Sequence, residues 1–314
     1  MELHRFLVVL TIVLVIMLTI VVWFFPSNED FRTENPFWNG TRDISSNYLV
    51  SPLQSLSDLP PSPPGTTLIL IPYLDFIPAE LEQLSSFVTK GGTLILADDY
   101  GYGNQILEYL ELKARFSGQT LLDPLFSYKN KWLPRISHLT SSSVTTNTES
   151  LVFNHATCLI DVETSDVLAL SSSFSFLDLN GNQAWDKDEP TGPLPVISHH
   201  NLGSGQIILI SDPSLFINSM ETIESNYTFI QNFTAITTSR LLIDQSHLPP
   251  SNLHQTKNLL ASARGYLITP VGTLGLVILA VTITLMPIWH KKEREGENAK
   301  GESKRDEASL SSFR

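Results

Sequence analysis

Apolar and polar positions follow their clearest pattern between residues 66 and 103. An apolar run over 68–71 is followed by an amphipathic segment over 78–89, a glycine pair and a second apolar run over 93–97. This order predicts a β-α-β unit. Strands that are apolar at every position are typical of parallel sheets with helices on both faces. We therefore expect an α/β domain built on a flavodoxin-like parallel sheet.

The same pattern returns after Gly203, where an apolar run over 207–210 is followed by a segment over 221–243 that has helical spacing. Both apolar runs end in acidic residues, at Asp98-Asp99 and at Asp212. Ligands of doubly wound sheets bind at the carboxyl ends of the strands.

Asp98, Asp99 and Asp212 are therefore the candidate catalytic residues. Grouped carboxylates bind hard cations or share a proton, so a metal-dependent hydrolytic site is one interpretation. The other is that each aspartate caps the turn or helix that follows it.

Two long apolar runs, over residues 6–25 and 266–289, stand at the two ends of the chain. Each is long enough to cross a hydrocarbon core of roughly 30 Å. The first ends in Trp23-Phe24-Phe25-Pro26, which offers no small-residue cleavage site, so an uncleaved anchor is predicted. Basic residues near membrane ends stay on the cytoplasmic side, and they precede the first run and follow the second. We expect a two-pass protein of the cell membrane.

The expected organisation has seven parts along the chain. These are a cytoplasmic N-terminus (1–5), a transmembrane helix (6–25), a Pro-rich lead-in (26–65), an extracytoplasmic α/β domain (66–245), a linker (246–265), a second transmembrane helix (266–289) and a charged cytoplasmic tail (290–314).

Charge narrows the choice of partners. The 314-residue chain has a formal net charge of −12, and acidic residues outnumber basic ones in the predicted outer part taken as a whole. This acidity argues against a nucleic-acid partner, whose phosphates require clustered lysine and arginine, and it is compatible with a basic partner. A single cysteine, Cys158, excludes an intrachain disulfide. Three sequons, at Asn39, Asn226 and Asn232, are candidates for glycosylation.

The segment from Asp178 to Glu189 has oxygen-bearing side chains at the spacing of a calcium-binding loop. It resembles an EF-hand-type or dockerin-type loop, except that Gln183 replaces the usual glycine at position six. An Asx-rich hairpin tip is the alternative, because Asn180-Gly181 is a strong turn signal. If calcium binds, the side-chain ligands are Asp178, Asn180, Asn182, Asp186 and Glu189.

Two sequence motifs lie between the two long apolar runs: GGTLILADDYG, which begins at Gly91, and GSGQIILISDPS, which begins at Gly203. Together they resemble an uncharacterised family of bacterial and archaeal membrane proteins related to the class I glutamine-amidotransferase-like fold and to gliding-motility-type proteins. The resemblance covers residues 66–243. It implies a flavodoxin-like sheet, no established activity, and association with other envelope proteins that include a MoxR-type ATPase system.

An amidotransferase requires a cysteine nucleophile on a strand-to-helix elbow and a histidine base. The corresponding elbow here is Asp98-Asp99-Tyr100-Gly101, and Cys158 lies elsewhere. The adjacent His199 and His200 could be a ligand pair or a base, but adjacent residues of an extended segment point to opposite faces, so we interpret them as a solvated loop pair. We therefore expect a non-catalytic binding or envelope-assembly component. The alternatives are a metal-dependent hydrolase and a calcium-stabilised surface domain.

Overall fold

The computed structural model describes residues 3–250, 252–282 and 284–285. The chain forms two compact units. One comprises residues 25–251, and the other comprises the segments that precede and follow it.

An eight-stranded sheet forms the centre of the unit over residues 25–251. Its strands run in the order β1 (Ser51–Leu53), β14 (Leu241–Asp244), β2 (Thr67–Leu70), β3 (Thr93–Ala97), β13 (Gly205–Ile210), β12 (Pro195–Leu202), β10 (Val167–Leu170) and β7 (His138–Leu139). Neighbours from β1 to β13 are parallel, and those from β13 to β7 are antiparallel. The fold is therefore mixed α/β with a large central sheet.

The predicted β-α-β unit is confirmed as β2, the helix α3 (Pro78–Thr89) and β3. The Glu80 carboxylate accepts the N–H of Ile77 at 2.9 Å, which satisfies a backbone donor at the start of α3. Gly91 then turns the chain toward β3 at a φ of +108°, which favours glycine.

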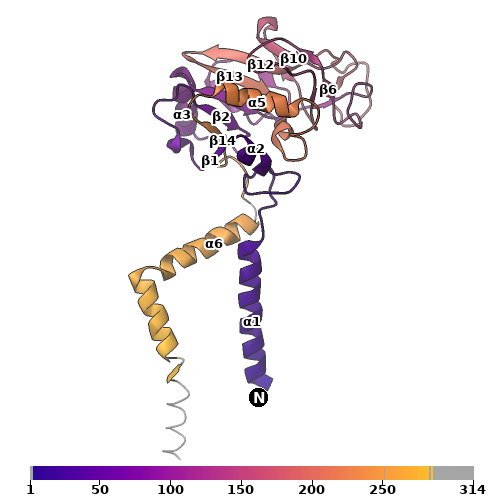
Figure 1. Cartoon of the computed structure of the whole chain (residues 1–314). Coiled ribbons are helices and arrows are strands. Elements are labelled where there is room, and N and C mark those ends of the chain that lie inside the picture. Colours follow the sequence, from indigo (N-terminus) through magenta and orange to yellow (C-terminus); the bar gives the residue numbers. More distant parts are fainter. Residues whose placement is uncertain (1–2, 251, 283, 286–314) are drawn as a thin grey trace, which may run out of the picture. The chain divides into compact units, whose positions relative to one another are not determined.

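Helices cover both faces of this sheet, as its apolar strands require (Figure 1). Side chains of α3 and α4 (Asn104–Tyr109) belong to one apolar core, and those of α5 (Asn226–Ile236) belong to the other. Successive residues of β3 alternate between the two cores: Leu94 and Leu96 face α3, whereas Ile95 and Ala97 face the core that contains α5. This alternation decides where the residues after each strand lie.

The helix expected over residues 221–243 is confirmed only over its middle part, Asn226–Ile236. α5 ends at Ile236, and β14 begins at Leu241. Between them, Thr238 and Ser239 donate their backbone N–H groups to the Gly65 carbonyl. β14 then fills the position between β1 and β2, where all four of its residues are buried. Pairing with distant strands therefore overrides the local helical spacing.

Three two-stranded sheets and several short helices accompany the central sheet. The strand pairs are β4 (Arg115–Phe116) with β9 (Leu159–Ile160), β5 (Thr120–Leu122) with β11 (Phe176–Asp178), and β6 (Arg135–Ile136) with β8 (Leu151–Val152). Short helices are α2 (Arg42–Asn47), η1 (Leu56–Asp58), η2 (Thr164–Asp166) and η3 (Pro213–Phe216).

The other unit contains α1 (Leu3–Phe24), whose residues 6–24 form a helix long and apolar enough to be a membrane span or a signal sequence. It also contains α6 (Asn252–Leu267) and a helical segment over Pro270–Thr282, bent by 84° relative to α6. This bend falls inside the second predicted span, over 266–289. That span and the two-pass topology stay predictions. Residue 283 and the predicted tail lie outside the described residues.

Candidate functional site

Asp99 and Asp212 follow two neighbouring parallel strands at the same level. Ala97 of β3 pairs with Ile210 of β13, and each aspartate is two residues beyond its strand's member of that pair. Both therefore continue the face that carries Ala97 and Ile210. Asp212 is fully buried; burial raises its pKa well above the ordinary value, and the charge of Asp99 raises it further.

Asp98 lies on the opposite face, with Leu94 and Leu96. Its carboxylate accepts the backbone N–H groups of Tyr100 at 2.8 Å, Gly101 at 3.0 Å and Gly103 at 2.6 Å. Burial raises the pKa of Asp98, and these hydrogen bonds oppose the rise. The side chain acts as a cap that holds the loop after β3.

Asp212 caps its own turn in a similar way. Its Oδ1 accepts the N–H of Ser214 at 2.8 Å at the start of η3, and its Oδ2 accepts the N–H of Asn154 at 2.7 Å. Both carboxylate oxygens of Asp212 thus accept backbone N–H groups. The capping interpretation made from the sequence accounts for the contacts of Asp98 and Asp212.

Asp99 differs from Asp98 and Asp212 because its Oδ1 atom is buried without a hydrogen-bond partner among the described residues. Burial, followed by the charge of Asp98, raises its pKa to about 7. Asp99 and Asp212 are therefore two carboxyl groups close enough for the charge of Asp99 to raise the pKa of Asp212. The structure brings this pair together and leaves Asp98 on the other face.

Tyrosines surround this edge of the sheet. Tyr73, three residues after β2, stacks on Phe31 with a ring separation of 5.5 Å. Its ring also contacts Tyr100 at 5.8 Å and Tyr102 at 6.3 Å. Burial and the charge of Asp99 raise the pKa of the Tyr73 hydroxyl. Sequence reasoning missed Tyr73, although its place just after an apolar strand was a usable signal.

A second polar group was also missed at the end of β14. His247 Nδ1 lies 3.0 Å from Asp244 Oδ2, and its Nε2 lies 3.5 Å from Glu80 Oε2. Burial lowers the pKa of His247, but Asp244 and Glu80 outweigh it and raise the pKa. Phe76 stacks on the imidazole with a ring separation of 4.1 Å. The signal was the phrase Leu-Leu-Ile-Asp, a third apolar strand that ends in acid.

All five predicted calcium ligands converge in one loop. Asp178 accepts the N–H groups of Gly181 and Gln183, and Glu189 accepts those of Leu179 and Asp186. The side-chain amides of Asn180 and Asn182 each donate to Asp186 Oδ2 at 2.7 Å.

The residue at position six of this loop has the backbone conformation that calcium loops require. Gln183 has a φ of +62°, in the left-handed region that usually selects glycine. The turn at position six is therefore present although glutamine replaces the usual glycine. No cluster of three or more histidine, cysteine, aspartate or glutamate side chains in the described part of the chain is arranged to hold a metal ion. The predicted calcium loop differs from such a cluster because two of its five predicted ligands are asparagines.

The three sequon asparagines all use their side-chain nitrogens within the fold. Asn39 donates to the Asn28 carbonyl, and Asn232 donates to the carbonyls of Val144 and Thr146. Asn226 is fully buried and donates to two carbonyls at 2.9 Å. A glycan at Asn226 requires that side chain to leave the core.

The histidine pair lies on a strand rather than in the expected loop. His199 and His200 belong to β12, and their side chains point to different partners. His199 contacts Gln206 at 2.9 Å, whereas His200 Nδ1 lies 3.2 Å from Asp166. Cys158 is buried, and burial raises its pKa to about 12, so it is not an activated nucleophile.

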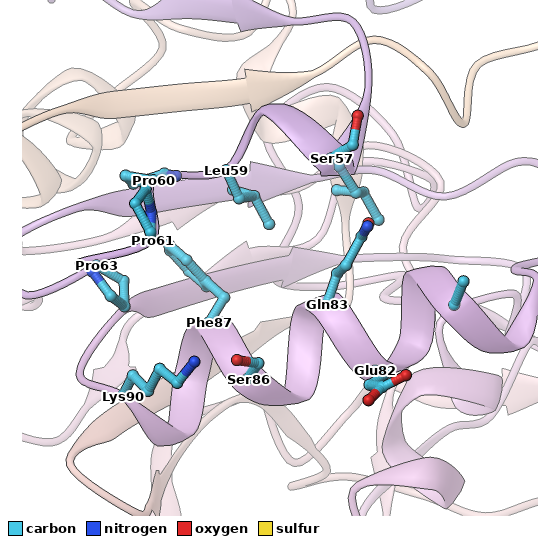
Figure 2. A pocket seen from close by; sticks show the side chains of 12 residues that line it. Ser57, Leu59, Pro60, Pro61, Pro63, Glu82, Gln83, Ser86, Phe87 and Lys90 are labelled. Atoms are coloured by element: carbon cyan, nitrogen blue, oxygen red, sulfur yellow. The ribbon is translucent and has the colours of Figure 1, made fainter.

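Three hollows open on the surface of this unit. One, of about 340 Å³, lies between the Pro-rich lead-in and α3, as Figure 2 shows, and contains none of the predicted site residues. A second, of about 370 Å³, is lined by Phe31 and Tyr73 together with residues 28–30 and 248–250. The third, of about 470 Å³, lies beside the loop after β3 and is lined by Asp75, Tyr100, Gly101, Tyr102, Asn104, Gln105 and Glu108.

Solved structures with a similar arrangement have low sequence identity to this chain. The N-terminal domain of mmIFT52 is 16% identical over 68% of this chain and 95% of that chain, with a TM-score of 0.48. A beta-galactosidase from Bacillus circulans sp. alkalophilus is 15% identical over 56% of this chain and 23% of that chain, with a TM-score of 0.36. Cytoplasmic protein STM1381 from Salmonella typhimurium LT2 is 13% identical over 61% and 79%, with a TM-score of 0.37.

Among curated proteins, no sequence matches this chain. A family profile does match, over residues 39–234, which is more than half of the chain and includes the parallel half of the sheet except β14. The chain therefore belongs to the family described as Domain of unknown function (DUF4350).

Proposed function

We propose that this protein is a membrane-anchored, non-catalytic binding component of the cell envelope, with its α/β unit outside the cytoplasm. The observation that supports this best is the use of the carboxylates at the sheet edge. Asp98 and Asp212 hold backbone N–H groups with both of their oxygens. The same loop leaves Tyr100 and Tyr102 exposed, and exposed tyrosines are frequent at binding surfaces.

The rival function is a metal-dependent hydrolase that uses Asp98, Asp99 and Asp212. Its support is the pairing of Asp99 with Asp212 and the buried, unpartnered Oδ1 of Asp99. Against it, Asp98 faces the other side of the sheet and is occupied as a cap.

Complementation separates the two functions. A strain that lacks this protein is complemented with the full chain or with Asp99→Asn, and its envelope integrity is measured. A binding component keeps its function in Asp99→Asn, because the change removes only a charge, whereas a carboxylate-dependent hydrolase loses it. Loss of function with normal expression and melting temperature would overturn the non-catalytic proposal.

The proposed topology places both termini in the cytoplasm. Cys158 is buried with a raised pKa, so it contributes little background to thiol labelling. Cysteines introduced at Glu34 and at Ser303 are treated with an impermeant maleimide in intact cells. We expect labelling at residue 34 alone. Labelling at residue 303 would contradict the two-pass arrangement.

A calcium-stabilised surface domain is the second candidate function. The observation that favours it is the convergence of Asp178, Asn180, Asn182, Asp186 and Glu189 around a left-handed Gln183. Bound calcium stabilises only the native state, so it raises the melting temperature if the loop takes the ion. Titration of the full chain with calcium, beside Asp178→Ala, tests this.

A further inference from the structure

The hollow beside the loop after β3, of about 470 Å³, combines aromatic rings with carboxylates. Tyr100 and Tyr102 are 66% and 42% exposed, although both are large apolar rings. Asp75 and Glu108 are exposed, and neither carboxylate has a hydrogen-bond or ion-pair partner among the described residues. Lysine, arginine and histidine do not contribute to the described lining. The hollow thus offers negative charge and ring faces.

The two amides in the lining are already used. Asn104 donates to the Phe116 carbonyl and accepts its N–H, at 2.9 and 2.8 Å. Gln105 makes the same pair of hydrogen bonds with Phe76, at 3.0 and 2.9 Å. Because each amide uses one N–H and its oxygen to pin a neighbouring segment, fewer directional donors and acceptors remain by which a neutral, hydroxyl-rich ligand would be recognised.

The tyrosine rings and carboxylates that line the hollow suit a cation. An ammonium or guanidinium group is attracted to the face of a tyrosine ring and to carboxylates, and guanidinium also forms paired hydrogen bonds with a carboxylate. An anionic ligand would be repelled by Asp75 and Glu108. The chain's net charge of −12 acts in the same direction over a longer range.

The rings are held in place before any ligand arrives. Asp98 fixes the backbone that carries Tyr100 through three N–H groups, and Tyr73 supports both exposed rings from below while stacking on Phe31. A surface that is ordered in advance loses little entropy on binding.

We propose that this hollow binds the lysine or arginine side chain of a basic segment in a partner protein. The inference rests on the proposed function as a binding component and adds the chemistry of the partner. The tyrosine faces bind the cation, Asp75 and Glu108 neutralise it, and the fixed loop sets the position.

The test uses the full chain in detergent micelles and a labelled hexa-arginine peptide at physiological salt, with binding followed by fluorescence anisotropy. We expect Tyr100→Ala and Glu108→Gln each to weaken binding about fivefold or more, and Tyr100→Phe to bind as the parent does. Tyr109→Ala and Glu82→Gln are the matched controls, because both side chains are exposed helix residues outside this hollow. Unchanged melting temperatures establish that each variant folds.

Equal weakening by the controls would mean that only general negative charge attracts the peptide, which overturns the site. Absence of peptide binding would overturn it as well. So would tyrosine-dependent binding of a neutral oligosaccharide, or concentration-dependent self-association that Tyr100→Ala abolishes. In all these cases complementation by Asp99→Asn still decides the proposed non-catalytic function, so failure of the site and failure of the function are distinguishable.

Discussion

Asp99 and Asp212 stand at the same level on neighbouring parallel strands, each two residues beyond the pair formed by Ala97 and Ile210. Asp98 precedes Asp99 directly but faces the other side of the sheet, where it caps the loop. Because the carboxylate of Asp98 accepts three backbone N–H groups and Oδ1 of Asp99 has no partner among the described residues, we expect opposite effects on stability when each is replaced by asparagine.

Asp99→Asn is expected to stabilise the protein above neutral pH. The folded pKa of Asp99 is about 7, against an ordinary 3.8, so the unfolded chain loses its proton first and stability falls as pH rises between these values. The amide of asparagine does not ionise, so the variant does not lose stability in this way as the pH rises. We expect a gain of about 1–3 kcal/mol above pH 7, after allowance for partial exposure, and almost none near pH 4. Urea unfolding at both pH values measures it.

Asp98→Asn is the matched control for that experiment. Its carboxylate accepts three backbone N–H groups, and an amide nitrogen cannot accept the one at Gly103. We expect a loss of about 1–3 kcal/mol. If Asp98→Asn cost no stability at pH 8, the capping role assigned to its three hydrogen bonds would be wrong.

Gln183→Gly is expected to strengthen the loop over Asp178 to Glu189. Glycine adopts the left-handed backbone of position 183 at lower cost, so the variant should gain about 1 kcal/mol and bind calcium more tightly. Calorimetric melting with calcium or with a chelator measures both effects. Gly181 has a φ of +75°, so Gly181→Ala should act in the opposite direction. A calcium-independent melting temperature in all variants would reduce the loop to a polar turn.

His247→Gln tests the polar group after β14. The folded pKa of His247 is raised, so its stabilisation is fully present at pH below the unfolded pKa and is lost as pH rises through the folded pKa. We expect His247→Gln to cost about 1–2 kcal/mol at pH 6 and less at pH 9. A pH-independent cost in chemical denaturation would show that packing against Phe76 is its whole contribution.

Arg32 links the segment before the sheet to the segment after it. Its guanidinium donates to the carbonyls of Gln245, Leu248 and Pro249 and pairs with Glu29 at 3.1 Å. Lysine cannot reproduce this fork, so Arg32→Lys should lose about 2–4 kcal/mol of unfolding free energy. Arg42→Lys, at an exposed position, is the control. Equal stability of both variants would refute the link.

Local patterns in the sequence predicted much of the fold. The apolar runs at 68–71, 93–97 and 207–210 became β2, β3 and β13, because a strand buried on both faces must be apolar at every position. The oxygen spacing from Asp178 to Glu189 likewise predicted a loop in which those side chains meet, because the hydrogen bonds that their carboxylates and amides make to one another and to the loop backbone lie within twelve residues.

What the sequence determined by itself were features that depend on near neighbours: the β-α-β unit, the long apolar N-terminal helix, the acidic strand ends and the twelve-residue loop. Only the tertiary structure decided which strands lie side by side. Placement of β14 between β1 and β2 turned an expected helix into a strand. The pairing of β3 with β13 set Asp99 beside Asp212, and the placement of β14 set His247 beside Glu80. Those contacts join residues more than a hundred positions apart, and local periodicity carries no information about them.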